Sequence, residues 1–422
     1  FLPWVGALKG PQLNGSQAIP TTTTLARSSA YHLVSSRPVV VYQFNPLEFK
    51  ASGGPPGKDW SACVKAAPLA PECYSYSNDA SLLLPSTAMT GAYRVMGAPG
   101  FSRTALGNVL PSYFLVTATA NGTNVSMKLG AKATVVGGGG IPSTPASGSL
   151  SVKLDAGDVA LVATELGRNF DVSGTLVTAD KPVQVISGVA CADMPYDVQA
   201  CDHIEETVFP AETLGKHYVV PRPTGPFGHG VSHIVRFFGN VDGTTLTYKP
   251  SLPPPGCPSK LNAGEVVQCG QVGFDFEVSG DHEFGVAVFL LGGEIVDPNV
   301  DPLGFTQPQG DPSQSFAVTV EQYRKRYVFL APPDYKTNYV DVIGAPNTKL
   351  TLDGEDVSSA FKTVKETEWQ LARLKLGAGK DGAHVLEANA PVGIQVLGYG
   401  DNTSYHYPGG LNLGQISAAP VK

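Results

Sequence analysis

Short runs of apolar residues that alternate with polar ones recur along most of this chain. Residues 39–44 (VVVYQF), 183–186 (VQVI) and 394–397 (IQVL) are examples, and Gly, Pro, Asn or Asp bound such runs. Alternate side chains of a strand point to opposite faces of its sheet, so this pattern is typical of antiparallel strands. Helical periodicity is poor almost everywhere. The pattern predicts an all-β fold built of antiparallel β-sandwiches.

The strand pattern also repeats at nearly constant offsets. Three segments have a similar copy later in the chain, in the same order. Residues 154–159 resemble 261–266, residues 170–174 resemble 276–280, and residues 181–186 resemble 283–288. A short strand-like segment with a central tyrosine also recurs, at Tyr93, Tyr218 and Tyr327. A pattern that repeats at a fixed period indicates one fold unit used several times. We therefore expect tandem β-sandwich modules.

The repeat gives about three complete modules and one partial module at the N-terminus. The predicted boundaries are 1–90, 91–216, 217–325 and 326–422. Segment 358–376 has a composition that would also suit a helix, but its place in the repeat predicts strands. The dipeptides at 121–122 (NG) and 242–243 (DG) predict hairpin turns. The partial first module favours a further segment upstream of residue 1, because half a sandwich exposes strand edges.

Composition narrows the class of protein. The 422 residues carry a dispersed net charge of −7, and no Lys/Arg cluster would follow a phosphate backbone, so nucleic acid is not an expected partner. No apolar run reaches the roughly 18 residues that a membrane-spanning helix needs. Glycine and proline number 48 and 35, which fits many short strands joined by turns.

The six cysteines fall into three local pairs with short, similar spacing. They predict three disulfides, Cys63 with Cys73, Cys191 with Cys201, and Cys257 with Cys269. Disulfides persist in oxidising compartments, so we expect a secreted or cell-surface protein. Reduced thiols or a zinc site are the alternatives, and the sequence has no Cys-x-x-Cys motif.

The densest polar cluster is residues 191–206, beside the second cysteine pair. Its carboxylates are candidate ligands for a hard cation such as Ca²⁺, and the expected ligands are Asp193, Asp197 and Asp202. A hydrolase would instead use Asp193, Asp202, His203 and Glu205. The third interpretation is a solvated loop that the disulfide braces.

A second acidic segment, 297–301, alternates oxygen-bearing side chains as a calcium loop does. Its candidate ligands are Asp297, Asn299 and Asp301. Pro302 stands where an EF-hand loop requires glycine, and the bidentate Glu is missing, so an acidic turn is the competing interpretation. The sequence also has no Gly-x-Ser-x-Gly, His-Glu-x-x-His or phosphate-binding glycine loop. We therefore expect no enzyme activity and no cofactor other than a candidate Ca²⁺.

Aromatic residues gather near the C-terminus, followed by Pro408, Gly409 and Gly410. We expect Tyr399, Tyr405, His406 and Tyr407 to be exposed, where they would serve an interface or ordinary strand packing.

Four strings of residues resemble the IgGFc-binding protein N-terminal domain family. They are 41–49 (VYQFNPLEF), 77–85 (SNDASLLLP), 201–206 (CDHIEE) and 405–411 (YHYPGGL). The close versions belong to large secreted or surface proteins of myxobacteria and relatives. The resemblance implies an extracellular binding or adhesion role without catalysis.

These observations together predict an extracellular structural or adhesive β-repeat protein. Its partners would be proteins or surface glycans, or other copies of the chain joined by strand pairing. Rigid display along a rod, through disulfide-braced loops and sheet edges, is the expected mechanism. The alternative is an extracellular metal-dependent hydrolase that uses the 191–206 cluster.

Overall fold

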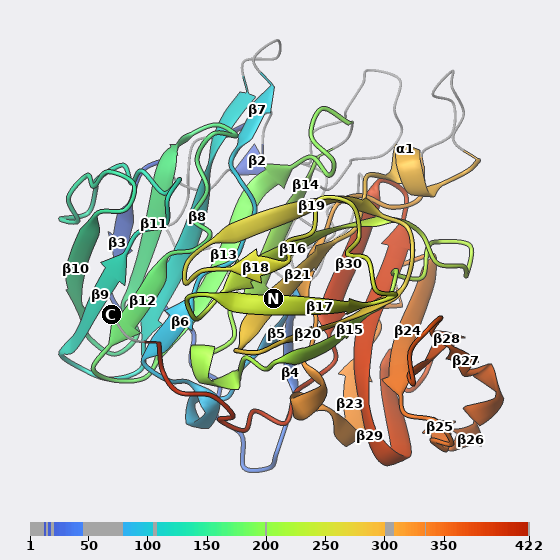
Figure 1. Ribbon diagram of the computed structural model, residues 1–422. Coiled ribbons are helices and arrows are strands. Elements are labelled where there is room, and N and C mark those ends of the chain that lie inside the picture. Colours follow the sequence, from blue (N-terminus) through green and yellow to red (C-terminus); the bar gives the residue numbers. More distant parts are fainter. Residues whose placement is uncertain are drawn as a thin grey trace.

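The computed structural model describes residues 21–44, 79–103, 108–198, 201–299, 308–333 and 335–420, and the backbone of two short strands, β1 (Gln12–Leu13) and β2 (Ser16–Gln17). In this part of the chain the regular structure is nearly all strand, and the one α-helix, α1 (Gly293–Val296), is a single turn. The predicted all-β class with antiparallel pairing is confirmed (Figure 1). No helix in the described ranges is long and apolar enough to cross a membrane.

Sandwich I is formed by two sheets around a common apolar core. One sheet has the order β10 (Ser149–Leu154), β9 (Thr123–Lys128), β12 (Leu176–Ala179), β6 (Ala92–Arg94). The other has the order β14 (Asp202–Thr207), β13 (Val183–Ala192), β8 (Asn108–Ala118), β11 (Val159–Leu166), β3 (Thr24–Ala26), and β7 (Phe101–Arg103) pairs with β8. Alternation explains the layering, because every second residue of β9 is buried in this core.

Sandwich II repeats this arrangement with shorter strands. One sheet has the order β15 (His217–Val220), β20 (Phe276–Gly280), β17 (Thr244–Lys249), β18 (Lys260–Leu261). The other has the order β19 (Val266–Val272), β16 (His233–Gly239), β21 (Phe284–Phe289), β22 (Gln314–Phe316). A buried cluster that includes Phe237, Phe276 and Phe284 fills the space between them.

Sandwich III is one sheet of eight strands that folds over itself along the long strand β29 (Ala383–Gly400). The first half of β29 pairs with β23 (Arg324–Leu330) and β25 (Leu350–Leu352), and its second half with β24 (Thr337–Gly344) and β30 (Thr403–Pro408). The remaining strands are β26 (Glu355–Asp356), β27 (Lys362–Thr363) and β28 (Gln370–Lys375). The prediction of strands over 358–376 is correct, apart from the 3₁₀ turn η7 (Ser358–Ala360).

Four antiparallel strand pairs meet at the centre of the molecule. They are β4 (Val41–Phe44) with β5 (Ala80–Leu83), β13 with β14, β21 with β22, and β29 with β30. We call β5, β14, β22 and β30 the linker strands. They contact one another in a closed cycle, because β5 and β22 each lie beside both β14 and β30. Residues 41–44 and 80–83 thus contribute a fourth strand pair of the repeating kind. The four module boundaries themselves stay predictions.

The sandwiches share a core and are not spaced along a rod as expected. One buried apolar cluster takes residues from all three, such as Met96, Phe238 and Ile343. The burial of β21 and β30 explains this shared core. All their residues are buried, so other parts of the protein must cover both faces of these strands. Figure 1 shows the result as three β-bodies side by side, with the C-terminal segment running back to sandwich I. There the amides of Ile416 and Ser417 bond to the carbonyl of Glu212.

Two further expectations are wrong, the exposure of the aromatic residues near the C-terminus and the two hairpins, whereas the alternative of ordinary strand packing for those aromatic residues is confirmed. Tyr399, Tyr405 and Tyr407 are fully buried and His406 is 3% exposed, because these residues belong to strands that neighbouring strands cover on both faces. The turns at 121–122 and 242–243 form, with Gly122 and Gly243 at positive φ. They are not hairpins, however, since the strands on either side, β8 and β9 or β16 and β17, belong to opposite sheets.

Candidate functional site

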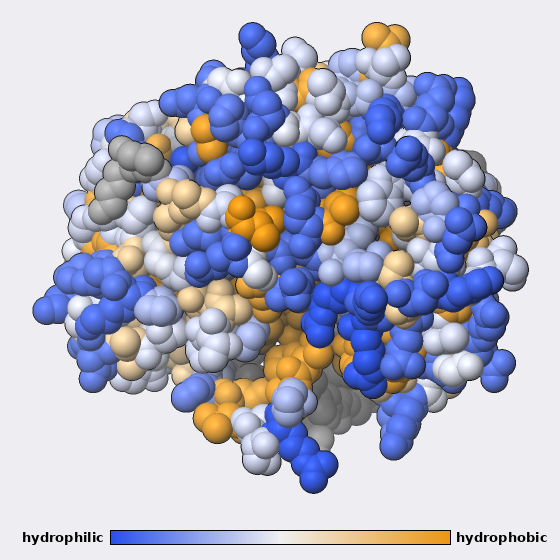
Figure 2. Space-filling model, turned by 60° about the horizontal axis from the view of Figure 1, so that its bottom comes forward, coloured by the Kyte–Doolittle hydropathy of each residue, from blue (hydrophilic) through white to orange (hydrophobic). Residues whose placement is uncertain are grey.

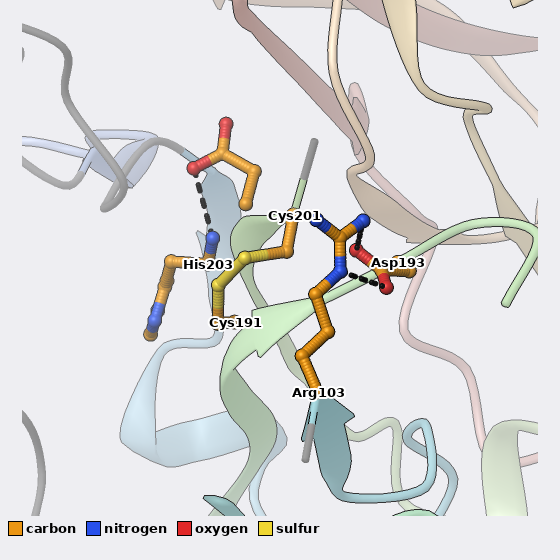
Figure 3. Close-up of a disulfide and its surroundings, with 6 residues drawn as sticks. Arg103, Cys191, Asp193, Cys201 and His203 are labelled. Carbon is orange, nitrogen blue, oxygen red and sulfur yellow. Dashed lines mark hydrogen bonds and ion pairs between the residues drawn. A yellow bond between two sulfur atoms is a disulfide. The ribbon is translucent and has the colours of Figure 1, made fainter. Parts of the chain in front are cut away.

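The 191–206 segment contains a disulfide between Cys191 and Cys201, as predicted, with 5.2 Å between their Cα atoms. It joins the end of β13 to the residue before β14, so it closes the connection between these paired strands. Figure 3 shows the Arg103 and Asp193 side chains directed at each other on one side of this disulfide and His203 on the other. Cys257 and Cys269 also form a disulfide, as predicted. Cys63 and Cys73 lie outside the described residues.

Asp193 and Asp197 are each held by an arginine. Arg103 contacts the two carboxylate oxygens of Asp193 at 3.3 and 3.4 Å, and Arg168 contacts those of Asp197 at 2.9 and 3.0 Å. Burial raises the pKa of Asp193 to about 6, although Arg103 opposes that shift. The cavity beside both aspartates has about 10 Å³, which is no larger than the space one water needs. A substrate would find no room there.

The other members of the proposed hydrolase group form a separate cluster on β14. His203 Nε2 lies 3.4 Å from Glu205 Oε2, and Gln43 donates a 2.6 Å hydrogen bond to Glu205 Oε1. Asp202 accepts a hydrogen bond from the amide of His203. The hydrolase residues are therefore engaged by different partners, and none of the four most prominent cavities of the described residues gathers Asp193 with His203 and Glu205.

The second acidic segment stabilises a turn. Asp297 accepts hydrogen bonds from the amide of Asn299 at 2.8 Å and of Gln309 at 2.9 Å, so its two oxygens connect two parts of the loop. Asp301 lies outside the described residues. In the part of the chain that the structure describes, no three His, Cys, Asp or Glu side chains come together as a metal site.

Sequence reasoning missed the central role of Asp79, a fully buried residue just before β5. Its Oδ2 accepts hydrogen bonds from the amides of Glu205 at 3.0 Å and Gln314 at 3.1 Å. One carboxylate thus connects the linker strands β5, β14 and β22. Burial raises the pKa of Asp79 well above its usual range, and the charge of Glu205 adds to this. A signal existed, since an aspartate precedes or begins each linker strand, at Asp79, Asp202, Asp311 and Asp401.

The outer edge of β4 has no paired strand among the described residues, unlike the strands equivalent to it. The equivalent strands β13, β21 and β29 each pair on that side with a further strand, respectively β8, β16 and β24. Among the described residues β4 pairs only with β5.

The segment 31–40, which leads into β4, is the second part of this surface. Its exposed large apolar side chains are Tyr31, Leu33, Val34, Val39 and Val40, and their exposed fractions run from 44% to 78%. We call β4 and residues 31–40 the edge surface. The segment lies at the bottom of Figure 1, and apolar atoms gather on the bottom face that Figure 2 turns forward. Apolar patches of this kind mark interaction sites.

Known proteins resemble this chain over most of its length. The human IgGFc-binding protein is 28% identical over 369 residues, which cover 86% of this chain and 6% of that protein. The chain thus spans a small part of this relative. A solved structure of an anti-sigma factor domain-containing protein from Clostridium clariflavum covers 75% of this chain and 83% of its own, at 14% identity and a TM-score of 0.12, and supports no argument about the fold. The sequence profile of the family described as IgGFc binding protein matches residues 79–398, so the chain belongs to that family, as its sequence strings predict.

Proposed function

We propose that this chain is an extracellular, non-catalytic domain that binds a protein partner by strand addition to the edge surface. The observation that carries the proposal is that β4 pairs on its outer edge with no further strand in the described ranges, whereas β13, β21 and β29 all do at that position. An extended segment that adds to a sheet edge gains main-chain hydrogen bonds, and side-chain pockets give it specificity. The family, whose name refers to a protein ligand, supports a binding role.

The surroundings of β4 favour a partner strand with apolar residues and carboxylates. Residues 28–40 carry His32 and Arg37 and no Asp or Glu, while the whole chain has a net charge of −7. A basic, apolar segment attracts an acidic, apolar one, and complementary charge speeds such an encounter. Two disulfides support an oxidising, extracellular setting. Bacterial origin, adhesion, glycan binding and self-association remain parts of this proposal, and no observation favours the hydrolase.

Hydrogen–deuterium exchange tests the proposal with three probes. They are the Fc fragment of IgG, a synthetic peptide that alternates valine with glutamate, and the chain itself at rising concentration. We expect at least one probe to slow exchange of the amides of residues 39–44, because strand addition gives these amides new acceptors.

A matched pair of variants tests whether binding needs the edge surface or only an exposed apolar side chain anywhere on the protein. Val39→Asp with Val40→Asp should abolish the protection. Leu252→Asp, which changes a side chain that is 78% exposed on sandwich II, should leave it unchanged. If none of the three probes protects residues 39–44, the proposed edge binding is wrong.

A further inference from the structure

A surface cleft of about 390 Å³ opens between sandwiches II and III, away from the edge surface. Four loops form it, those that follow β15 and β17, that between β19 and β20, and that between β27 and β28. Its lining residues are Arg222, Pro250, Gly273, Phe274, Asp275 and Lys365. Clefts of this volume are typical sites for small ligands.

The guanidinium group of Arg222 has unused hydrogen-bonding capacity in this cleft. Its Nε is shielded from solvent and has no hydrogen-bond partner among the described residues. The nearest carboxylate oxygen, Asp275 Oδ1, lies 3.8 Å away, beyond hydrogen-bond distance. The side chain is about a third exposed, so a ligand in the cleft can reach it. The two terminal nitrogens donate no hydrogen bond among the described residues, so an incoming carboxylate can accept two parallel hydrogen bonds from them.

Asp275 is shared between Arg222 and the protein framework, because the oxygen that lies 3.8 Å from Arg222 Nε also accepts two other hydrogen bonds. Asp275 Oδ1 accepts a 2.8 Å hydrogen bond from the backbone amide of Arg222 and a 3.0 Å bond from Arg373. Arg373 also donates a 2.8 Å bond to the carbonyl oxygen of Arg222. This network fixes the backbone of Arg222, while its side chain makes a 3.8 Å ion-pair contact with Asp275 and no hydrogen bond among the described residues. Lys365, with a side chain that is 83% exposed, adds a second cation, which Glu366 contacts at 3.3 Å.

Phe274 supplies an apolar wall beside the cation. It is 38% exposed, and its ring packs edge-on against the buried Phe276, with 6.4 Å between the ring centroids. The neighbouring Gly273 and Pro250 bring no further polar side chain into the cleft. A flat aromatic face suits the C–H face of a sugar ring, and an adjacent arginine suits a carboxylate on that ring.

We propose that this cleft binds an acidic monosaccharide, a uronic or sialic acid, with its carboxylate on Arg222 and its ring against Phe274. The cleft has room for one such unit, so the ligand would be free or at the end of a glycan chain. This site goes beyond the proposed function, since it lies on sandwiches II and III and needs no strand edge.

Saturation-transfer NMR and calorimetry on the full chain test the site. The probes are glucuronic acid and N-acetylneuraminic acid, with glucose and N-acetylmannosamine as their neutral counterparts. We expect an acidic sugar to bind and the neutral ones not to bind at the same concentration. Arg222→Gln should weaken binding by at least about tenfold, because it removes the charge and keeps the backbone bond to Asp275. Phe274→Ala should reduce the saturation transfer to the ring protons.

The control is Arg326→Gln, which removes an exposed arginine on β23 that is paired with Glu387. It should leave sugar binding unchanged, and thermal melts should show that all variants stay folded. The proposal is overturned if neither acid binds, if neutral and acidic sugars bind equally, or if Arg222→Gln binds as the unchanged chain does. Binding of an acetylated acidic peptide at Arg222 without binding of either acidic sugar would also overturn it. None of these results bears on exchange at residues 39–44.

Discussion

The hydroxyl of Tyr93 donates a 2.6 Å hydrogen bond to the carbonyl oxygen of Val183, which joins the two sheets of sandwich I. The hydroxyl oxygen of Tyr93 also accepts a hydrogen bond from the amide of Thr90, three residues earlier. Tyr218 repeats the arrangement in sandwich II with Phe284 and Gly215, and Tyr327 repeats it in sandwich III with Val392 and Arg324. In each case a 3₁₀ turn begins seven residues before the tyrosine; these turns are η3 (Ser86–Ala88), η5 (Ala211–Thr213) and η6 (Val320–Gln322). The recurring tyrosine of the sequence therefore makes the same pair of hydrogen bonds in each sandwich, one to a carbonyl oxygen of a distant strand and one from the amide three residues earlier.

Tyr218→Phe should lower the free energy of unfolding by about 1–3 kcal/mol, because it leaves the carbonyl of Phe284 and the amide of Gly215 without their partner in a buried setting. Urea unfolding followed by circular dichroism measures this. The control is Leu252→Ala, at a side chain of sandwich II that is 78% exposed, which should change the unfolding free energy by less than about 0.5 kcal/mol. Equal stability of Tyr218→Phe and the unchanged chain would show that the hydrogen bond does not matter.

The repeat was readable in the sequence because it depends on local pattern. Alternation predicts the strands, and the tyrosine at fixed spacing marks the start of each sandwich. The order of strands within sheets was not readable, as the turn at Gly122 shows, since the same turn residues can join strands of one sheet or of two. The burial of Tyr405 and Tyr407 was also hidden, because it depends on Tyr42 and Phe44, more than 350 residues away in the chain, whose rings pack on them.

The candidate sites also divide into features that local sequence predicts and features that depend on distant residues. The Cys191–Cys201 disulfide was predictable from spacing alone. The arginines that form ion pairs with Asp193 and Asp197 are Arg103 and Arg168, which are distant in the sequence. No sequence feature near the two aspartates indicates these partners. The cleft at Arg222 is formed by loops that meet only after two sandwiches pack together, so sequence reasoning had no means to find it.

Arg236→Met should destabilise the protein by about 3–5 kcal/mol. Arg236 of β16 contacts Asp171 of sandwich I at 2.5 Å, with both side chains 5% exposed, and removal of the cation leaves a buried carboxylate unpaired. Arg236 also donates to the carbonyl of Gly97, so it connects sandwiches I and II. Urea unfolding should show one transition with a lower midpoint.

The double variant Arg236→Met with Asp171→Asn should be more stable than Arg236→Met alone, because it removes the unpaired charge. An exposed pair gives the comparison, since Arg326→Met should change the unfolding free energy by less than about 1 kcal/mol. If sandwiches I and II unfold in separate transitions, or if the single and double variants are equally stable, this buried pair does not couple them.

Replacement of Cys257 and Cys269 by serine should lower the unfolding free energy by about 3 kcal/mol, because a crosslink over 12 residues restricts the unfolded chain. The pair Cys191 and Cys201, 10 residues apart, should give a similar loss. Thermal melts with and without reductant measure both. Reductant should lower the melting temperature of the unchanged chain more than that of a chain in which both pairs are serine. Identical shifts would show that neither disulfide contributes.

His233→Leu should flatten the loss of stability at acid pH. Burial, with smaller contributions from His406, Arg222 and Arg373, lowers the pKa of His233 to about 3. The unfolded chain takes up this proton near pH 6.5, whereas the folded chain does not until about pH 3. The contribution of this neutral histidine is therefore complete above pH 6.5. It declines as the pH falls below that value, by up to about 1.4 kcal/mol per pH unit.

Urea unfolding at pH 7.5, 6.0 and 5.0 measures this difference between the unchanged chain and His233→Leu. Neither ring nitrogen of His233 has a hydrogen-bond partner among the described residues, so leucine removes no such bond. Buried carboxyls with raised pKa values, such as Asp79 and Glu206, act in the opposite direction, but they are present in both proteins and cancel in the comparison. His32→Leu, at an exposed histidine, should follow the unchanged chain at every pH. Parallel pH profiles of His233→Leu and the unchanged chain would mean that His233 takes up its proton equally in the folded and unfolded states.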